Sequence, residues 1–355
     1  MKILQIIPGF WVGGAEVMCK NLLLSLKALG HEAVAVSLFP DRTEMCRELE
    51  EAGIRVYYLD KKLGLDLSMI GKLKEIILEE QPQAVNSHLD SIKYAAAAAR
   101  LAGVKKCFHT IHSLAEKECE GKAQKIINTT YFKLGFSTPV ALSGQVRDSI
   151  AAFYGLNPEK IPVIPNGIDL DRCTPKESYA VGETVELVHV GRFDVPKNHV
   201  GMLRAFKLLY DQNPQCRLTL VGDGDLREEI EKTIAELEIA PWVTLAGMQK
   251  DVYPYLKKAD IFTLPSVYEG NPMSIIEAMG FGLPIAASNV GGIPDMIRDG
   301  NTGLLFEPQP EAICQGWMKL IESESLRKTL GENARRDSSR FSARTMAQRY
   351  AEIYD

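Results

Sequence analysis

The sequence has no paired cysteine motif. Its seven cysteines, at positions 19, 46, 107, 119, 173, 216 and 314, are odd in number, and no two form a Cys-x-x-Cys pair. A disulfide framework needs an even set, and a structural zinc site needs closely spaced thiol or imidazole ligands. We therefore expect reduced, buried thiols, as in a cytosolic protein, and neither a disulfide framework nor a metal site built on cysteine.

Long apolar runs and an excess of basic charge are also missing. No window approaches the roughly 18 apolar residues of a membrane-spanning helix. The net charge of -5 argues against a general nucleic-acid binder, whose binding face is basic. The first residues have one basic side chain, Lys2, and an apolar run that Pro8 and Gly9 end, so they predict a strand rather than a signal peptide. These absences favour a cytoplasmic protein without a nucleic-acid partner.

Several catalytic motifs are absent. The first apolar run is followed by Gly9, Gly13 and Gly14, and not by the Gly-x-Gly-x-x-Gly pattern of dinucleotide oxidoreductases. A Walker loop, a His-Glu-x-x-His helix and a Ser-His-Asp order are not found either. The sequence therefore contains none of these motifs that would indicate hydrolysis or phosphoryl transfer.

What is present is a regular alternation of short apolar runs with amphipathic stretches, which is typical of parallel sheets with crossover helices. The length of 355 residues suits two domains. The predicted strands lie near 2–7, 33–39, 54–58, 83–87, 105–111, 139–142 and 161–164, then near 185–190, 217–221, 242–245, 260–264 and 284–287. The predicted helices lie near 14–29, 43–52, 66–80, 91–102, 115–133 and 144–154, then near 198–211, 225–238, 250–258, 272–280, 309–321 and 342–354.

The two series are separated by a polar stretch, 171–183, that has no sustained periodicity. We place a first domain at 1–168, a second at 169–340 and a terminal helix at 341–355, with Ser342 as its cap. The fold class is α/β, with two doubly wound domains. Ligands of such sheets bind beyond the carboxyl ends of the strands.

The segment Tyr268 to Glu277 joins a predicted strand end to a helix start and holds two carboxylates eight residues apart. Asn271 is the expected N-cap and Pro272 the first helical residue. The free N–H groups near Met273 and Ser274 then suit a phosphate, and Glu277 reaches a sugar or ribose hydroxyl. The alternative is a capped helix with two solvated glutamates.

Two cations follow the predicted strand 185–190. Arg192 emerges at its carboxyl end and Lys197 starts the next helix. The planar guanidinium of Arg192 and the ammonium of Lys197 can therefore hold one diphosphate together. The alternative is a surface ion pair, for instance with Asp194. Asp223 and Asp225 have Asp-x-Asp spacing, but Asp225 is favoured as a helix cap over a metal ligand.

The first domain offers further candidates. Gly13 and Gly14 open the first helix, where backbone can approach an anion closely, although a tight turn explains them as well. His109 leans toward the interior, whereas His112 ends its strand and can grip a sugar hydroxyl; a structural role is the alternative for His112 and for His88. Basic residues of this region are interrupted by acidic ones, which favours a solvated face over a membrane-binding patch: Lys105, Lys106, Lys117, Lys122, Lys125 and Lys133, with Glu116, Glu118 and Glu120.

Taken together, these motifs resemble the retaining glycosyltransferases of family 4. The elements that carry the resemblance are Gly13 to Glu16, His112, Pro165 to Asp169, Gly191-Arg192 with Lys197, Val221 to Gly224, and the Glu-x7-Glu element from Glu269 to Glu277. The resemblance spans nearly the whole chain and implies the GT-B architecture, two Rossmann-like domains facing across a cleft. It also implies that the terminal helix returns to the first domain.

The resemblance implies roles for individual residues. Arg192 and Lys197 would hold the donor diphosphate, and the turn of Gly270, Asn271, Pro272, Met273 and Ser274 would supply N–H groups to phosphate and sugar. Glu277 would take the ribose hydroxyls, Glu269 a hydroxyl of the transferred sugar, and His112 another sugar contact. Gly14 would let the first loop close on the phosphates, Gly222 belongs to the donor side, and the base would lie near Gly247, Met248 and Val252. No metal and no cofactor are expected.

The function implied is transfer of a sugar from a UDP- or GDP-sugar, with retention, to a saccharide, lipid-linked or small-molecule acceptor in cell-surface polysaccharide or glycolipid synthesis. Two alternatives stay open, a nucleotide-sugar epimerase of the same architecture and a non-catalytic sugar-nucleotide-binding module. A weak peripheral association of the N-terminal domain with the inner face of a membrane also stays open. The acceptor and the oligomeric state are not encoded in any motif.

Overall fold

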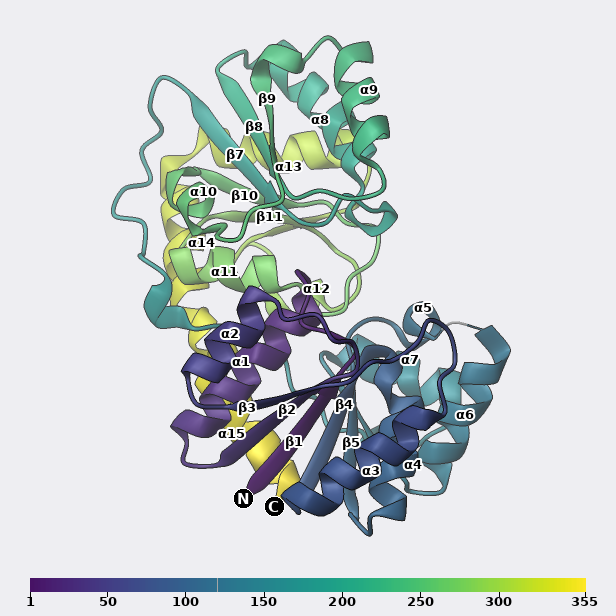
Figure 1. Cartoon of the computed structure of the whole chain (residues 1–355). Helices are drawn as coiled ribbons and strands as arrows, with labels where there is room; N and C mark the ends of the chain where they lie inside the picture. Colours follow the sequence, from purple (N-terminus) through teal and green to yellow (C-terminus); the bar gives the residue numbers. More distant parts are fainter. Residues whose placement is uncertain (120) are drawn as a thin grey trace. The chain divides into compact units, whose positions relative to one another are not determined.

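The computed structural model describes residues 1–119 and 121–355, so Glu120 lies outside the described residues. Its contacts divide the chain into two compact units. The N-terminal unit comprises Met1–Asp169 together with Phe341–Asp355, and the C-terminal unit comprises Leu170–Arg340. Each unit has one parallel sheet with helices around it (Figure 1).

The N-terminal unit has a six-stranded sheet in the order β3-β2-β1-β4-β5-β6. Its strands are β1 (Lys2–Ile7), β2 (Glu32–Ser37), β3 (Arg55–Tyr58), β4 (Ala84–His88), β5 (Lys106–Ile111) and β6 (Thr138–Ala141). Its helices are α1 (Gly14–Ala28), α2 (Glu44–Glu51), α3 (Ser68–Glu80), α4 (Ile92–Leu101), α5 (Ala115–Glu118), α6 (Gly121–Lys133), α7 (Gly144–Tyr154) and α15 (Ala343–Tyr354).

The C-terminal unit repeats this plan in the order β12-β11-β10-β7-β8-β9. Its strands are β7 (Val185–Val190), β8 (Cys216–Val221), β9 (Val243–Gly247), β10 (Ile261–Leu264), β11 (Ile285–Ser288) and β12 (Leu304–Phe306). Its helices are α8 (His199–Gln212), α9 (Arg227–Glu236), α10 (Tyr253–Lys258), α11 (Met273–Phe281), α12 (Ile293–Met296), α13 (Pro310–Glu322) and α14 (Glu324–Asp337).

The apolar runs form central strands because helices cover both faces of each sheet. In β1, Ile3, Leu4, Ile6 and Ile7 are all fully buried, and Ile261, Phe262 and Leu264 of β10 are buried as completely. Continuous burial, rather than alternation, is what a parallel sheet between two helix layers requires. The buried side chains form a separate core in each unit, one around β1 and β4 and one around β7 and β8.

Most predicted elements are present, with ends shifted by a few residues. The prediction of a strand near 161–164 is wrong, because Val163 makes only an isolated bridge with Ala141. The helix predicted over 115–133 is divided into α5 and α6. The structure adds β12 and α14, which the sequence did not indicate.

The terminal helix α15 belongs to the N-terminal unit and lies beside α1 and β1 (Figure 1). Its predicted cap is confirmed: Ser342 Oγ accepts a hydrogen bond from the backbone N of Thr345 at 3.0 Å. The chain just before α15 is tied to Ile168, whose N–H donates to Phe341 O at 3.0 Å. Tyr350 and Tyr354 of α15 are fully buried.

Candidate functional site

In each unit, the edge of the sheet formed by the carboxyl ends of its strands is the candidate place for ligand binding. In the C-terminal unit β7 is the first strand, and its neighbours are β8 on one side and β10 on the other. After β7 the chain continues to β8 on one side, and after β10 it continues to β11 on the other side. The carboxyl ends of β7 and β10 therefore flank the topological switch point, which is where sheets of this kind bind ligands. Lys197 follows β7 and Glu269 follows β10.

Lys197 and Glu269 form a largely buried ion pair. Lys197 Nζ lies 2.5 Å from Glu269 Oε1, and the two side chains are 18% and 9% exposed. Ser266 Oγ donates to the same carboxylate oxygen at 2.7 Å. The ammonium and the carboxylate are thus held at the sheet edge by partners that come from loops more than 60 residues apart in sequence.

Backbone hydrogen bonds hold the loops of this pair together. The N–H of Val267 donates to Pro196 O at 2.8 Å, and the N–H of Gly292 donates to Glu269 O at 3.0 Å. Asn198, which has a positive φ of 56°, donates from Nδ2 to Pro265 O and to Pro308 O, each at 3.0 Å. The positions of Lys197 and Glu269 are therefore set by backbone rather than by the ion pair alone.

Arg192 also emerges at this edge, with its guanidinium in solvent. The surface ion pair considered for it exists with Asp225 and not with Asp194: Arg192 Nη2 lies 3.9 Å from Asp225 Oδ2, and the side chains are 68% and 92% exposed. A pair so exposed contributes little free energy, so the guanidinium can turn to an anion at small cost. The prediction that Asp225 caps a helix is wrong, because α9 starts at Arg227 with Leu226 before it and no side-chain cap.

Gly222 brings the loop after β8 against the loop after β7. Its φ is 144°, and a Cβ at this position would lie 2.0 Å from Gly191 O. Only glycine fits such a contact, so the two loops approach each other closely because residue 222 has no side chain.

The turn before α11 differs by one residue from the prediction. The helix begins at Met273, and Pro272 is its N-cap with no side-chain hydrogen bond, so Asn271 is not the cap. Asn271 is buried instead, at 5% exposure. Gly270 and Pro272 are buried too, whereas Met273 and Ser274 are partly exposed. The first turn of α11 therefore still offers free N–H groups to an anion.

Glu277 lies one turn inside α11 and is not a solvated glutamate. Burial raises its pKa to about 8, the charge of Asp251 adds to this, and Arg172 opposes it. The guanidinium carbon of Arg172 lies 4.8 Å from the centre of the Tyr253 ring. Met248, which the resemblance places near a base, is 60% exposed. Arg172 is a residue that the sequence did not suggest, because it lies in the stretch taken for a linker.

The raised pKa of Glu277 predicts a pH dependence of stability. The native state binds a proton here between the ordinary value of 4.5 and about 8, and the unfolded state does not. The protonated carboxyl thus contributes stability that is fully present below pH 4.5 and is lost as the pH rises through 8. Glu277→Gln should therefore become more stable relative to the parent by at least ~1 kcal/mol between pH 5 and pH 9.

This expectation is checked by urea unfolding of Glu277→Gln and the parent at both ends of that pH range. Glu236→Gln serves as a matched control, since Glu236 lies on an exposed helix face and is 62% exposed. A difference between parent and Glu277→Gln that does not change with pH would contradict it.

In the N-terminal unit, the candidates lie at the carboxyl edge of β1, β4 and β5. Gly14 is the first residue of α1, as predicted, and Gly13 before it is extended. His112 follows β5 and is half-buried, and its Nε2 lies 3.0 Å from Nδ1 of the fully buried His88. His109 is buried, as predicted, and its Nδ1 lies 2.9 Å from Ser87 Oγ.

Glu118 is a residue that the sequence interpreted wrongly. It was assigned to a solvated face, but its Oε2 accepts from the backbone N–H groups of His112, at 2.6 Å, and Ser113, at 2.9 Å. Burial raises the pKa of the carboxyl to about 7, and the two backbone donors oppose the rise. Glu118 therefore fixes the backbone that carries His112.

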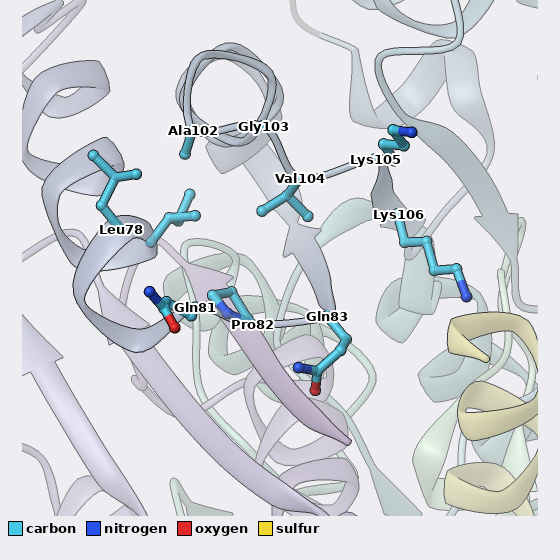
Figure 2. Close-up of a pocket in the computed structure, with 10 residues that line it drawn as sticks. Leu78, Gln81, Pro82, Gln83, Ala102, Gly103, Val104, Lys105 and Lys106 are labelled. Atoms are coloured by element: carbon cyan, nitrogen blue, oxygen red, sulfur yellow. The ribbon is translucent and has the colours of Figure 1, made fainter.

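A separate recess lies at the other edge of the same sheet (Figure 2). It has a volume of about 460 Å³ and is lined by the end of α3 and by the segments that precede β4 and β5. Leu78, Pro82 and Val104 border it, whereas the Lys105 and Lys106 side chains extend away from them (Figure 2). Because the recess is at the amino ends of the strands, it is apart from the residues described above.

Two family models match the chain. Residues 12–172 match the model described as Glycosyltransferase Family 4, and residues 174–337 match the model described as Glycosyl transferases group 1. The two matches meet near the boundary between the two units and together span nearly the whole chain.

Curated relatives are similar over most of their length. The putative glycosyltransferase EpsF of Bacillus subtilis is 28% identical over 307 residues, which is 81% of this chain and 79% of that protein. An Escherichia coli protein named UDP-Gal:alpha-D-GlcNAc-diphosphoundecaprenol alpha-1,3-galactosyltransferase is 29% identical over 258 residues, which is 68% of this chain and 67% of that protein.

A solved structure of Anabaena Alr3699/HepE in complex with UDP-glucose has the same fold, with a TM-score of 0.87 at 21% identity over 99% of this chain and 98% of that one. A glycosyltransferase from Rickettsia africae has a TM-score of 0.82 at 20% identity over 99% of this chain and 97% of that one. The two matched models and these relatives identify the chain as an enzyme that transfers hexosyl groups: it belongs to the family 4 glycosyltransferases and has the GT-B fold.

Proposed function

We propose that the chain transfers a sugar from a UDP- or GDP-sugar to a saccharide or lipid-linked acceptor, with retention of the anomeric configuration, in cell-surface polysaccharide or glycolipid synthesis. The observation that carries the proposal is the group of Lys197, Arg192 and the free start of α11 at one sheet edge. These are the groups that a departing nucleoside diphosphate needs. The Escherichia coli relative is named for a UDP-sugar donor and a lipid-linked acceptor, which supports the same classes here.

The chemistry follows from the leaving group. A departing nucleoside diphosphate gains negative charge, and fixed cations and N–H dipoles aimed at that charge stabilise the transition state. Lys197 and Arg192 supply the cations, and Met273 and Ser274 supply N–H groups. The diphosphate needs no protonation, so the acid and base carboxylates that glycosidases use are not required.

Retention is proposed from the resemblance to the retaining family, and the state of Glu269 bears on its route. Glu269 Oε1 is engaged by Lys197 and Ser266, which argues against Glu269 as a nucleophile that forms a covalent intermediate. We assign Glu269 to a hydroxyl of the transferred sugar and Glu277 to the ribose hydroxyls. The acceptor would then attack from the face that the diphosphate leaves, with a phosphate oxygen taking its proton.

The test is a thermal-shift panel of UDP- and GDP-sugars followed by product analysis. A ligand that binds only the native state raises its stability by about 2.7 kcal/mol at 100 times its Kd. We expect one base and one sugar to stabilise the protein most, and that donor to yield a glycoside only when an acceptor is added. Conversion of the donor alone into its epimer, or no stabilisation by any member of the panel, would reject the proposal.

We also propose that the N-terminal unit contacts a membrane surface through the loop between β3 and α3. Leu63, Leu65 and Leu67 of this loop are 92%, 66% and 64% exposed. The loop is nevertheless held in place, because Asp66 accepts from the backbone N of Lys62 at 3.0 Å and of Ser68 at 3.1 Å. Burial of one such leucine in an apolar phase is worth about 1.5–3 kcal/mol.

No helix among the described residues is long and apolar enough to cross a bilayer. Leu63→Ser/Leu65→Ser/Leu67→Ser should lose binding to vesicles of phosphatidylcholine and phosphatidylglycerol in co-sedimentation. Leu101→Ser/Leu134→Ser is the matched control, since both leucines are 62% exposed but precede the amino ends of strands. Equal vesicle binding by the two variants would contradict the assignment.

A further inference from the structure

A buried chain of polar side chains runs from the terminal helix to His112, and it accounts for residues that the mechanism above does not use. Tyr354 OH lies 3.2 Å from Gln5 Nε2, and Gln5 Oε1 lies 2.9 Å from His88 Nε2. His88 Nδ1 lies 3.0 Å from His112 Nε2. We call these four residues the histidine chain. Tyr354, Gln5 and His88 are all fully buried.

The hydrogen-bond partners give the chain a direction. Gln5 Nε2 donates to Tyr354 OH, and Gln5 Oε1 accepts from Asn86 Nδ2 at 2.9 Å. The atom that faces His88 Nε2 is therefore an acceptor, so His88 Nε2 must carry a hydrogen. Asn86 Nδ2 also lies 3.2 Å from His88 Nε2, but its two hydrogens have nearer acceptors in Gln5 Oε1 and, at 3.1 Å, Thr110 Oγ1.

The remaining hydrogens follow from the neutral rings. Burial lowers the pKa of His88 well below 6.5 and that of His112 to about 3, so each ring carries one hydrogen at neutral pH. His88 Nδ1 then carries no hydrogen and accepts a hydrogen bond, so His112 Nε2 must carry the hydrogen and donate it. His112 Nδ1 is left with a lone pair, and no described residue bonds to it.

We propose that Gln5 and His88 are positioning residues that hold His112 in its Nε2–H tautomer, so that Nδ1 presents a hydrogen-bond acceptor to a sugar hydroxyl. The inference rests on the proposed sugar contact of His112 and specifies its chemistry: the group recognised is a hydroxyl that donates. The side chain that sets which end of the Gln5 amide faces His88 is Asn86, because its amide nitrogen can only donate to Gln5 Oε1, whereas the Tyr354 hydroxyl can donate or accept.

The first test is the tautomer itself. Long-range ¹H–¹⁵N correlation spectra of the full chain labelled with [¹⁵N]histidine report which ring nitrogen carries the hydrogen, and His112→Ala and His88→Ala spectra assign the signals. We expect both His88 and His112 as Nε2–H. Signals that show His112 as Nδ1–H in the parent protein would overturn the proposal, whatever the fate of the transferase assignment.

Gln5→Glu is the decisive variant. A carboxylate in place of the amide keeps His88 protonated at both nitrogens, so His88 Nδ1 would donate and His112 would change to Nδ1–H. His112 would then present a donor, and kcat/KM for the donor sugar should fall at least tenfold while nucleoside diphosphate affinity stays the same. A Gln5→Glu protein with unchanged His112 signals and unchanged kcat/KM would contradict the chain.

The matched control is Tyr350→Phe. Tyr350 lies on α15, one turn before Tyr354, and its hydroxyl lies 2.9 Å from Oγ1 of Thr110 in β5 without bonding to the histidine chain. We expect the His112 tautomer to persist in Tyr350→Phe and to become mixed in Asn86→Leu, which removes the amide nitrogen that donates to Gln5 Oε1. A loss of the tautomer in both variants would mean that general packing around the buried polar side chains, and not the direction of the chain, determines it. Failure of the nucleotide-sugar panel would instead reject the proposed function and leave the tautomer result standing.

Discussion

Replacement of Lys197 by alanine is expected to slow sugar transfer by roughly 100- to 1000-fold, the usual effect of removing one fixed group that faces developing charge. The ammonium is held by Glu269 at 2.5 Å and is only 18% exposed, so it is already oriented before the donor binds. Release of nucleoside diphosphate from the preferred donor, with acceptor present, measures the change in kcat.

Two further variants separate catalysis from folding. Lys197→Ala leaves the buried Glu269 carboxylate unpaired, which can cost about 3–5 kcal/mol of stability. Lys197→Ala/Glu269→Gln removes that unpaired charge, so it should recover stability without recovering turnover. Lys207→Ala, which breaks only the exposed pair with Asp211 at 2.6 Å, should keep normal turnover. Turnover that returns in the double variant would show that Lys197 acts only through stability.

Replacement of Gly291 by alanine is expected to destabilise the C-terminal unit and to abolish transfer. A Cβ at this position would lie 2.0 Å from Glu269 O and 2.8 Å from Glu269 N, and the backbone φ is 62°. Backbone atoms cannot move aside as a flexible side chain can, so the loop that carries Glu269 must shift. The expected cost is about 3 kcal/mol or more, since a steric clash adds to backbone strain.

Gly300→Ala is the control that isolates the clash. Its φ of 68° matches that of Gly291, but a Cβ there would meet nothing within 4 Å. The strain of a left-handed residue alone costs about 1–2 kcal/mol, so Gly300→Ala should remain folded and active. Urea unfolding and diphosphate release are measured for both variants, and similar losses in both would show that the contact with Glu269 has no special effect.

The fold was largely predictable because its central strands, such as β1 and β10, are buried on both faces. Such strands appear as continuous apolar runs, and every run longer than three residues in the C-terminal unit was identified. The strand β12 has only three residues, too few for a pattern. The helix α14 was missed because its sequence is strongly charged and contains Gly331, which suggests a break. Gly331 is instead needed for packing, since a Cβ there would lie 2.4 Å from the Tyr179 ring.

The candidate site was predictable only in part. The positions of Arg192, Lys197 and Glu277 follow from their places at strand ends and helix starts, which local pattern can show. The pairing of Lys197 with Glu269 joins residues 72 apart, and it depends on which strands are neighbours in the sheet. Glu118 and Arg172 were not identified because burial and contact with His112 or Tyr253 are decided by tertiary packing, and charged residues in polar stretches are usually solvated.

The most direct measurement of the central claim is a calorimetric titration of the preferred nucleoside diphosphate and its parent nucleoside into the native chain and into Lys197→Ala. If Lys197 holds the diphosphate, the substitution should weaken the diphosphate at least tenfold, about 1.4 kcal/mol, and leave the nucleoside unchanged. Binding in which the diphosphate gains nothing over the nucleoside, or in which Lys197→Ala weakens both equally, would contradict the assignment of this edge as the donor site.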